Sequence, residues 1–98
     1  MLINLKKEIV NLKGNSIKDG ESPLTLGQTL AEIVLAPHKD KDGFRPLKAL
    51  EMARKLYANE TYDIDQSDLI QLKKIVEENQ SYIPLVTGQI LETLESLK

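Results

Sequence analysis

The sequence predicts a mainly α-helical protein, a compact four-helix domain with a short N-terminal β-hairpin or extended segment. Four runs of apolar residues recur at helical spacing, and each begins with a capping residue or a proline. At 98 residues the chain is near the commonest length of a single domain, and it can bury a core without disulfides. We therefore expect one domain over residues 1–98, with a hairpin or arm at 1–20 and a helical bundle over 25–98.

The first 20 residues differ in character from the rest. Residues 2–5 and 8–12 are short stretches rich in branched side chains, and Gly14 with its neighbouring asparagine follows them. A Gly-Asn pair between apolar residues is typical of a hairpin turn, because both residues tolerate positive φ. We therefore favour a small β-hairpin. The alternative is a short amphipathic helix over residues 4–12.

The first helix is predicted over residues 26–35. Thr25 can cap its start, and Gln28 lies at the spacing of a capping box. Pro37 ends it, because proline removes a backbone donor and disfavours helix in the residue before it. One face carries the apolar residues Leu26, Leu30, Ile33 and Val34. The opposite face carries the polar residues Gln28, Thr29 and Glu32.

A second helix is predicted over residues 46–58. Pro46 suits the first helical position, where the backbone N–H would have no partner in any case. An unusually wide arc of this helix is apolar, comprising Ala49, Leu50, Met52, Ala53, Leu56 and Tyr57. An arc of this width indicates a helix packed against more than one neighbour.

The third and fourth helices follow with short connections. Asp65 or Ser67 would cap the third helix, which extends to about residue 78. Its apolar stripe is Leu69, Leu72, Ile75 and Val76. The fourth helix begins at Pro84 and continues towards residue 97, with a stripe of Val86, Ile90, Leu94 and Leu97. Four helices of this length joined by short loops predict a bundle.

A repeated pattern, P-L-x-x-G-Q-x-L, occurs at residues 23–30 and again at 84–91. The two glycines lie differently relative to the apolar stripes: Gly27 flanks the first stripe, whereas Gly88 lies on the far side of the second. In a structural duplication the two glycines would occupy the same position relative to the apolar stripe. We interpret the pattern as two helix starts that independently use proline and a capping glutamine. Gly88 on an exposed face suggests close approach by another chain.

Composition excludes several classes of function. The net charge of −2 and the pI near 5.4 argue against a broad phosphate-binding face, so nucleic acid is not an expected partner. The absence of cysteine rules out disulfides, thiolate zinc sites and cysteine nucleophiles. No apolar run approaches the length of about 18 residues that a membrane span needs. We expect a cytoplasmic protein that is not an enzyme and has no cofactor.

The loop around His38 is the nearest approach to a metal motif. With Gly43 at the sixth position of a calcium loop, Asp40 and Asp42 would be placed correctly, but Ala49 stands where the bidentate glutamate belongs. We interpret this loop as a solvated turn with no metal. The closely spaced carboxylates after residue 60 are similarly interpreted as turn and helix-start residues, namely Asp63, Asp65 and Asp68.

Two groups of residues are candidates for binding. The first is the locally basic stretch around the second helix, where an anion could face Arg45, Lys48 and Arg54. The second is a set of apolar residues at helix ends, outside the main stripes, which with the exposed glycine could form a subunit interface. This set is Leu24, Leu35, Tyr82, Leu85 and Gly88. The alternative for the apolar set is that the N-terminal segment covers it.

Four stretches also carry a family resemblance. They are residues 12–14 (Leu-Lys-Gly), 24–27 (Leu-Thr-Leu-Gly), 47–56 and 84–94, and together they span most of the chain. This layout resembles small proteins encoded by tailed bacteriophages and prophages. The resemblance implies a phage or prophage context and supplies no catalytic residue.

These observations together predict a non-enzymatic helical protein-interaction module, phage-encoded according to the resemblance. It would form a homo-oligomer and bind a phage or host protein in the host cytoplasm. One alternative is a phage protein that sequesters a small anionic ligand, such as a signalling nucleotide, at a subunit interface. A second alternative is a nucleic-acid-associated regulator, which the acidic pI disfavours.

Overall fold

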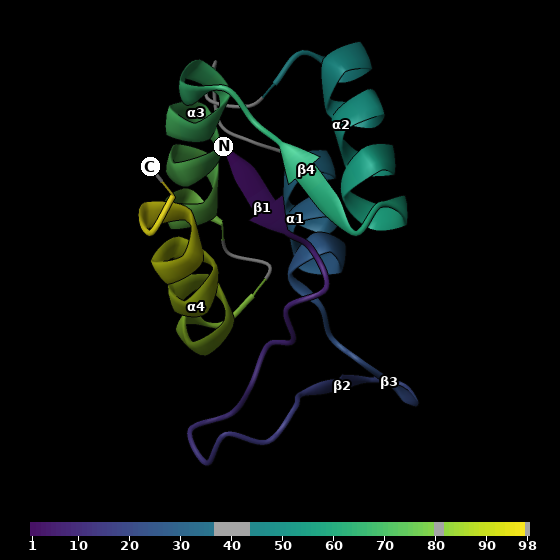
Figure 1. Ribbon diagram of the computed structural model, residues 1–98, viewed down its shortest axis with the longest axis vertical. Helices are drawn as coiled ribbons and strands as arrows, with labels where there is room; N and C mark the ends of the chain where they lie inside the picture. The colour runs from purple at the N-terminus through teal and green to yellow at the C-terminus, as the bar shows by residue number, and fades with distance from the viewer. Residues whose placement is uncertain (37–43, 80–81, 98) are drawn as a thin grey trace.

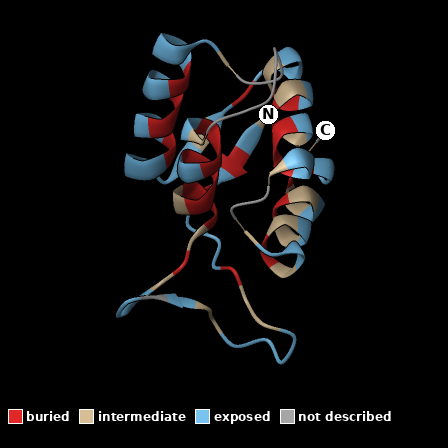
Figure 2. Ribbon diagram, turned by 180° about the vertical axis from the view of Figure 1, so that it is seen from behind, coloured by how far each residue is buried: buried red, intermediate tan, exposed pale blue. Residues whose placement is uncertain are grey.

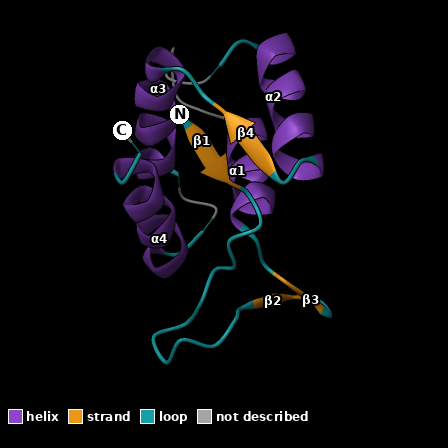
Figure 3. Cartoon of the chain, viewed as in Figure 1, coloured by secondary structure: helices purple, strands orange, loops and turns teal. Residues whose placement is uncertain are grey.

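The computed structural model describes residues 1–36, 44–79 and 82–97. Within these residues the chain forms four helices, which confirms the mainly α class (Figures 1 and 3). The helices are α1 (Leu26–Leu35), α2 (Pro46–Ala58), α3 (Gln66–Glu78) and α4 (Pro84–Glu95). The short strands are β1 (Leu2–Asn4), β2 (Lys18–Asp19), β3 (Ser22–Pro23) and β4 (Thr61–Asp63). None of the described helices is long and apolar enough to cross a membrane.

Helix α1 is the central helix of the fold. Seven of its ten residues are buried, so it is covered on nearly every side (Figure 2). The prediction that Thr29 lies on a polar outer face is wrong, because this side chain is fully buried. Its hydroxyl donates to the backbone oxygens of Leu26 and Thr25, at 2.9 and 3.2 Å. The hydroxyl is therefore satisfied within its own helix, which lets a polar residue occupy the core.

Helices α1 and α2 approach each other closely at Gly27. A Cβ atom added to Gly27 would lie 2.4 Å from the backbone oxygen of Leu56 and 3.0 Å from the Cβ of Leu5. The backbone N–H of Gly27 donates to the oxygen of Leu5 at 3.0 Å. Gly27 therefore brings together α2, α1 and the segment that follows β1, and only a residue without a side chain fits there.

Strand β1 does not form the hairpin predicted for residues 1–20. It pairs antiparallel with β4, with Ile3 opposite Tyr62. Two further bonds extend the ladder: Leu5 N–H donates to Glu60, and Ile64 N–H donates to Met1. An isolated two-stranded hairpin is only marginally stable, whereas this pairing places Ile3 over the helical core. The segment at 61–63, predicted to be a connector, is therefore a strand.

Residues 6–25 form an irregular arm that returns to α1, and they contain no helix at 4–12 (Figure 1). The turn predicted at Gly14 exists, with φ of 87°. The segments around it share one bridge, between Val10 and Ser16, and two backbone hydrogen bonds, from Asn11 N–H to Asn15 and from Ile17 N–H to Ile9. Strands β2 and β3, which have two residues each, form a second short hairpin after this turn. Ile9 is buried, and its N–H donates to the oxygen of Leu24, so the arm is anchored in the core.

Helices α3 and α4 pack side by side, on the opposite side of the molecule from α2 (Figure 1). Asp65 caps α3 by accepting from the N–H of Asp68 at 2.7 Å, as the sequence suggested. The apolar stripes predicted for both helices are buried, with the exception of Leu97, which is partly buried beyond the end of α4.

The two copies of the repeated pattern occupy different structural positions. Pro23 lies in β3, before α1 begins, whereas Pro84 is the first residue of α4. Gly27 is enclosed, but nothing lies within 4 Å of a Cβ added to Gly88. The side chain of Gln89, in the second copy, accepts a hydrogen bond from the backbone N–H of Val10 at 3.0 Å. It also donates one to the backbone oxygen of Val10 at 2.6 Å. The difference in register supports two independent helix starts, and α4 uses its glutamine to hold the arm.

The two glycines should respond in opposite ways to alanine. We expect Gly27→Ala to lower the free energy of unfolding by about 1–3 kcal/mol, because the new methyl group meets backbone that must shift. Gly88→Ala should raise it by up to about 1 kcal/mol, because alanine is the better helix former and the space is open. Urea unfolding of both variants measures this. Equal effects would contradict the close approach at Gly27.

The bonds between Gln89 and Val10 predict how the arm is held. Replacing Gln89 with alanine removes three hydrogen bonds, two with Val10 and one to the oxygen of Leu85, each contributing roughly 0.5–1.5 kcal/mol. Hydrogen exchange at the Val10 amide should become faster, while exchange in α1 stays slow. Gln66→Ala, on the exposed first turn of α3, is the matched control. Unchanged exchange at Val10 would show that the arm is held by its apolar anchors alone.

Candidate functional site

The outer face of α2 is the most unusual surface of the described chain. Three large apolar side chains on it are solvent-exposed: Leu47 is 70%, Leu50 37% and Tyr57 69% exposed. With Arg54, they fall within an arc of about 80° at the 3.6-residue period of a helix. Single exposed apolar residues are common, but several on one helical face mark an interaction surface. We call these residues, together with Glu51, the α2 face.

The exposure of the α2 face follows from how α2 packs. Its buried side consists of Ala49, Met52, Ala53 and Leu56, and the backbone of α2 meets α1 at Gly27. The side chains of the α2 face lie outside this buried arc. The broad apolar arc of the sequence was predicted to contact more than one neighbour. Helix α2 does contact both α1 and β4, but Leu50 and Tyr57 remain 37% and 69% exposed. Figure 2 shows the exposed outer side of α2 in pale blue.

Lys48 borders the α2 face but is already engaged. Its ammonium lies 2.7 Å from a carboxylate oxygen of Asp68 in α3 and 5.5 Å from the centre of the Phe44 ring. The hydrogen bond to Asp68 raises the pKa of Lys48 above its ordinary value of 10.5, which outweighs the opposing effect of partial desolvation. Burial similarly raises the pKa of the nearby Tyr62 hydroxyl. Lys48 therefore ties α2 to the start of α3.

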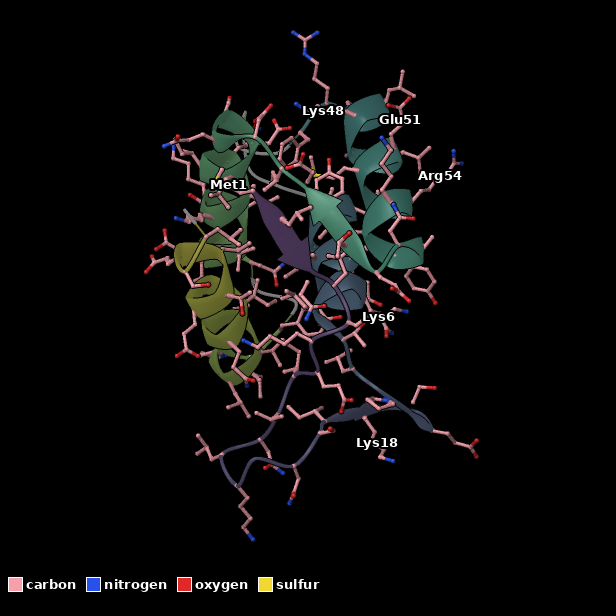
Figure 4. The ribbon with its side chains drawn as sticks, viewed as in Figure 1. Met1, Lys6, Lys18, Lys48, Glu51 and Arg54 are labelled. Atoms are coloured by element: carbon pink, nitrogen blue, oxygen red, sulfur yellow. The ribbon has the colours of Figure 1, made fainter. Side chains whose placement is uncertain are left out.

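Glu51 and Arg54 are the two charges within the α2 face. Both side chains are exposed, and Figure 4 shows them extending from α2 away from the body of the molecule. In the described part of the chain, neither forms an ion pair. They are therefore free to meet opposite charges on a partner.

The basic residues predicted to face an anion do not converge. Lys48 is held by Asp68, while Arg45 precedes α2 and is exposed. Arg54 is nine residues further on, about 13 Å along the helix axis. The two arginines therefore lie far apart, and the ammonium of Lys48 between them is already paired with Asp68. The geometry gives no support for a nucleotide pocket within a single chain.

The residues predicted to form an apolar interface are only partly brought together. Leu24 is only 7% exposed and belongs to the hydrophobic core, so it cannot contribute to a surface. Tyr82 and Leu85 are half-buried near the start of α4, beside exposed Gly88. Leu35 is exposed at the end of α1, which lies at a different end of the molecule (Figure 1). Three of the five predicted residues therefore lie together at the start of α4, whereas Leu24 and Leu35 do not join them.

The predicted metal loop and the carboxylate cluster add no site. His38, Asp40 and Asp42 lie outside the described residues. Asp65 caps α3, and Asp68 binds Lys48, so each of these carboxylates has its own structural partner. In the described ranges, no three acidic or histidine side chains lie close enough together to hold a metal ion.

Sequence reasoning missed the α2 face, although one signal was present. Leu47, Leu50 and Tyr57 recur at helical spacing and extend the apolar arc of α2 beyond Ala53. Comparison with protein-family models, with curated protein sequences and with solved structures gave no match. The α2 face is therefore interpreted from its own geometry.

The contact between Lys48 and Asp68 predicts a response to alkaline pH. Because the folded-state pKa of Lys48 is raised, its contribution to stability is complete below pH 10.5 and is lost as the pH rises through the raised value. Tyr62 acts in the same direction, so the comparison is best made with Tyr62→Phe present.

In that background, Lys48→Arg should lessen the fall in the thermal unfolding midpoint above pH 10.5, because arginine stays charged to above about pH 12. Thermal unfolding followed by circular dichroism across this range measures the effect. Identical pH profiles for the two proteins would show that the contact does not contribute.

Proposed function

We propose that this protein is a non-enzymatic protein-interaction module that binds its partner through the α2 face. The observation that carries the proposal is the joint exposure of Leu47, Leu50 and Tyr57 on one side of a helix whose other side is buried. Within the described residues 21 apolar side chains are buried in the core, so the fold can bury large side chains where its packing requires it. The exposure of three large apolar side chains on one helical face therefore indicates a surface that another molecule covers.

The chemistry of the α2 face suits a protein partner. Tyrosine and arginine are enriched at the energetic centres of protein interfaces, and both are present here with two leucines. The face lies on a helix rather than on a loop, so its backbone is already ordered before binding. A preformed surface loses less conformational entropy on association.

The setting proposed for this interaction is that of the phage proteins the sequence resembles. In that setting the partner is another phage protein, a host protein or a further copy of the chain. The same outer face would serve in each case, because the other helices turn their apolar stripes into the core.

A photo-crosslinking residue placed at Tyr57 tests the proposal in the cells where the protein occurs. We expect a discrete crosslinked product, because Tyr57 lies within the α2 face and is 69% exposed. The same residue placed at Lys74, on the exposed side of α3, is the matched control. Adding Leu47→Lys should abolish the product formed from position 57.

A product of twice the chain mass identifies a second copy, and any other mass identifies a different protein. Either result supports an interaction module. Absence of a product at position 57, or equal products at positions 57 and 74, would overturn the proposal.

A further inference from the structure

We infer that the α2 face binds a second copy of this chain, with the two α2 helices packed antiparallel about a twofold axis that passes between residues 52 and 53. The inference rests on the proposed function, because it names the partner for that surface. In a twofold dimer one patch must complement itself, so each attractive contact occurs twice. The order of residues along the α2 face meets this requirement.

The charges are self-complementary in the antiparallel arrangement. Glu51 and Arg54 lie symmetrically on either side of the proposed axis, each about 2 Å from it at a rise of 1.5 Å per residue. Glu51 of one copy is therefore level with the partner's Arg54, and symmetry repeats the contact. Both side chains are exposed, and in the described part of the chain neither has an ion pair to give up.

The apolar residues are matched in the same register. Leu47 lies about 8 Å from the axis along one direction, and the partner's Tyr57 lies about 7 Å along the same direction. A leucine at one end of the α2 face therefore meets a tyrosine ring of the other copy. Leu50 lies level with the carbon stem of the partner's Arg54 to within about 2 Å, and such stems cover apolar surface while the charged head remains hydrated.

A parallel arrangement of the two helices lacks these contacts. It would set Glu51 against the partner's Glu51 and Arg54 against the partner's Arg54. Like charges in register oppose association and select the antiparallel alternative. Lys48 does not disturb the antiparallel pair, because Asp68 of its own chain neutralises it.

The size of the surface sets the expected strength of the dimer. A helix of 13 residues is about 20 Å long, and one pair of such helices buries less than the roughly 1,600 Å² of a standard stable interface. The dimer is therefore reversible, and it dissociates as the protein is diluted. This behaviour makes the dissociation constant directly measurable.

Sedimentation equilibrium over a dilution series is the experiment, performed on the full chain. The wild type should show a monomer–dimer equilibrium. Glu51→Arg creates two Arg–Arg contacts and Arg54→Glu creates two Glu–Glu contacts, so each variant alone should raise the dissociation constant about tenfold or more. An equimolar mixture of the two variants places opposite charges at both contacts, and it should recover association as a heterodimer.

Matched controls separate this effect from a general change in charge. Glu77→Arg in α3 and Lys55→Glu on α2 outside the face make the same charge changes on exposed residues, and both should dimerise like the wild type. Circular dichroism should be unchanged in all variants, because the substituted side chains are exposed.

A monomeric wild type at every concentration would overturn the inference, as would undiminished dimerisation of either single variant or failure of the mixture to associate. The proposed function fails separately, through the absence of a Tyr57-specific crosslinked product. A product with a different protein from a chain that stays monomeric would retain the proposed function and reject the self-association.

Discussion

The close approach of α1 and α2 at Gly27 is the constraint on which the rest of the structure depends. The backbone oxygen of Leu56 occupies the space that a Cβ atom would need, and the N–H of Gly27 binds the oxygen of Leu5. Leu5 directly follows β1, so this bond fixes where β1 leaves the core. Pairing of β1 with β4 then joins the start of the chain to the segment between α2 and α3. One residue without a side chain thus sets the geometry of three elements.

The same constraint explains the exposed surface. The buried side of α2 carries Ala49, Met52, Ala53 and Leu56, and the close approach to α1 lies at the backbone oxygen of Leu56. A helix packed on one side in this way leaves its remaining side chains to solvent. The large apolar residues of α2 therefore divide into those that face α1 and those that cannot reach it. The α2 face results from close packing on the opposite side of the same helix.

The arm has a structural role that complements this packing. The arm extends away from the core, turns at Gly14 and returns to the start of α1. Most of its backbone is irregular (Figure 3). Buried Ile9, the side chain of Gln89 and the bond from the Lys7 ammonium to Thr93 hold it in place. These contacts join α4 to the arm, which runs from the end of β1 to the start of α1. The segment thereby connects the two helix pairs, α1 with α2 and α3 with α4, without itself forming regular secondary structure.

The sequence by itself determined the helices, because their signals are local. Apolar spacing and capping residues such as Thr25 and Asp65 act within one or two turns, and the observed helices begin where these signals predicted. Only the tertiary structure decided which strand β1 joins, that Thr29 is buried, and which side of α2 stays exposed. Each of these outcomes depends on contacts between residues far apart in the chain. An apolar residue shows the same pattern whether the core or a partner covers it, so the candidate site could not be located before the packing at Gly27 was known.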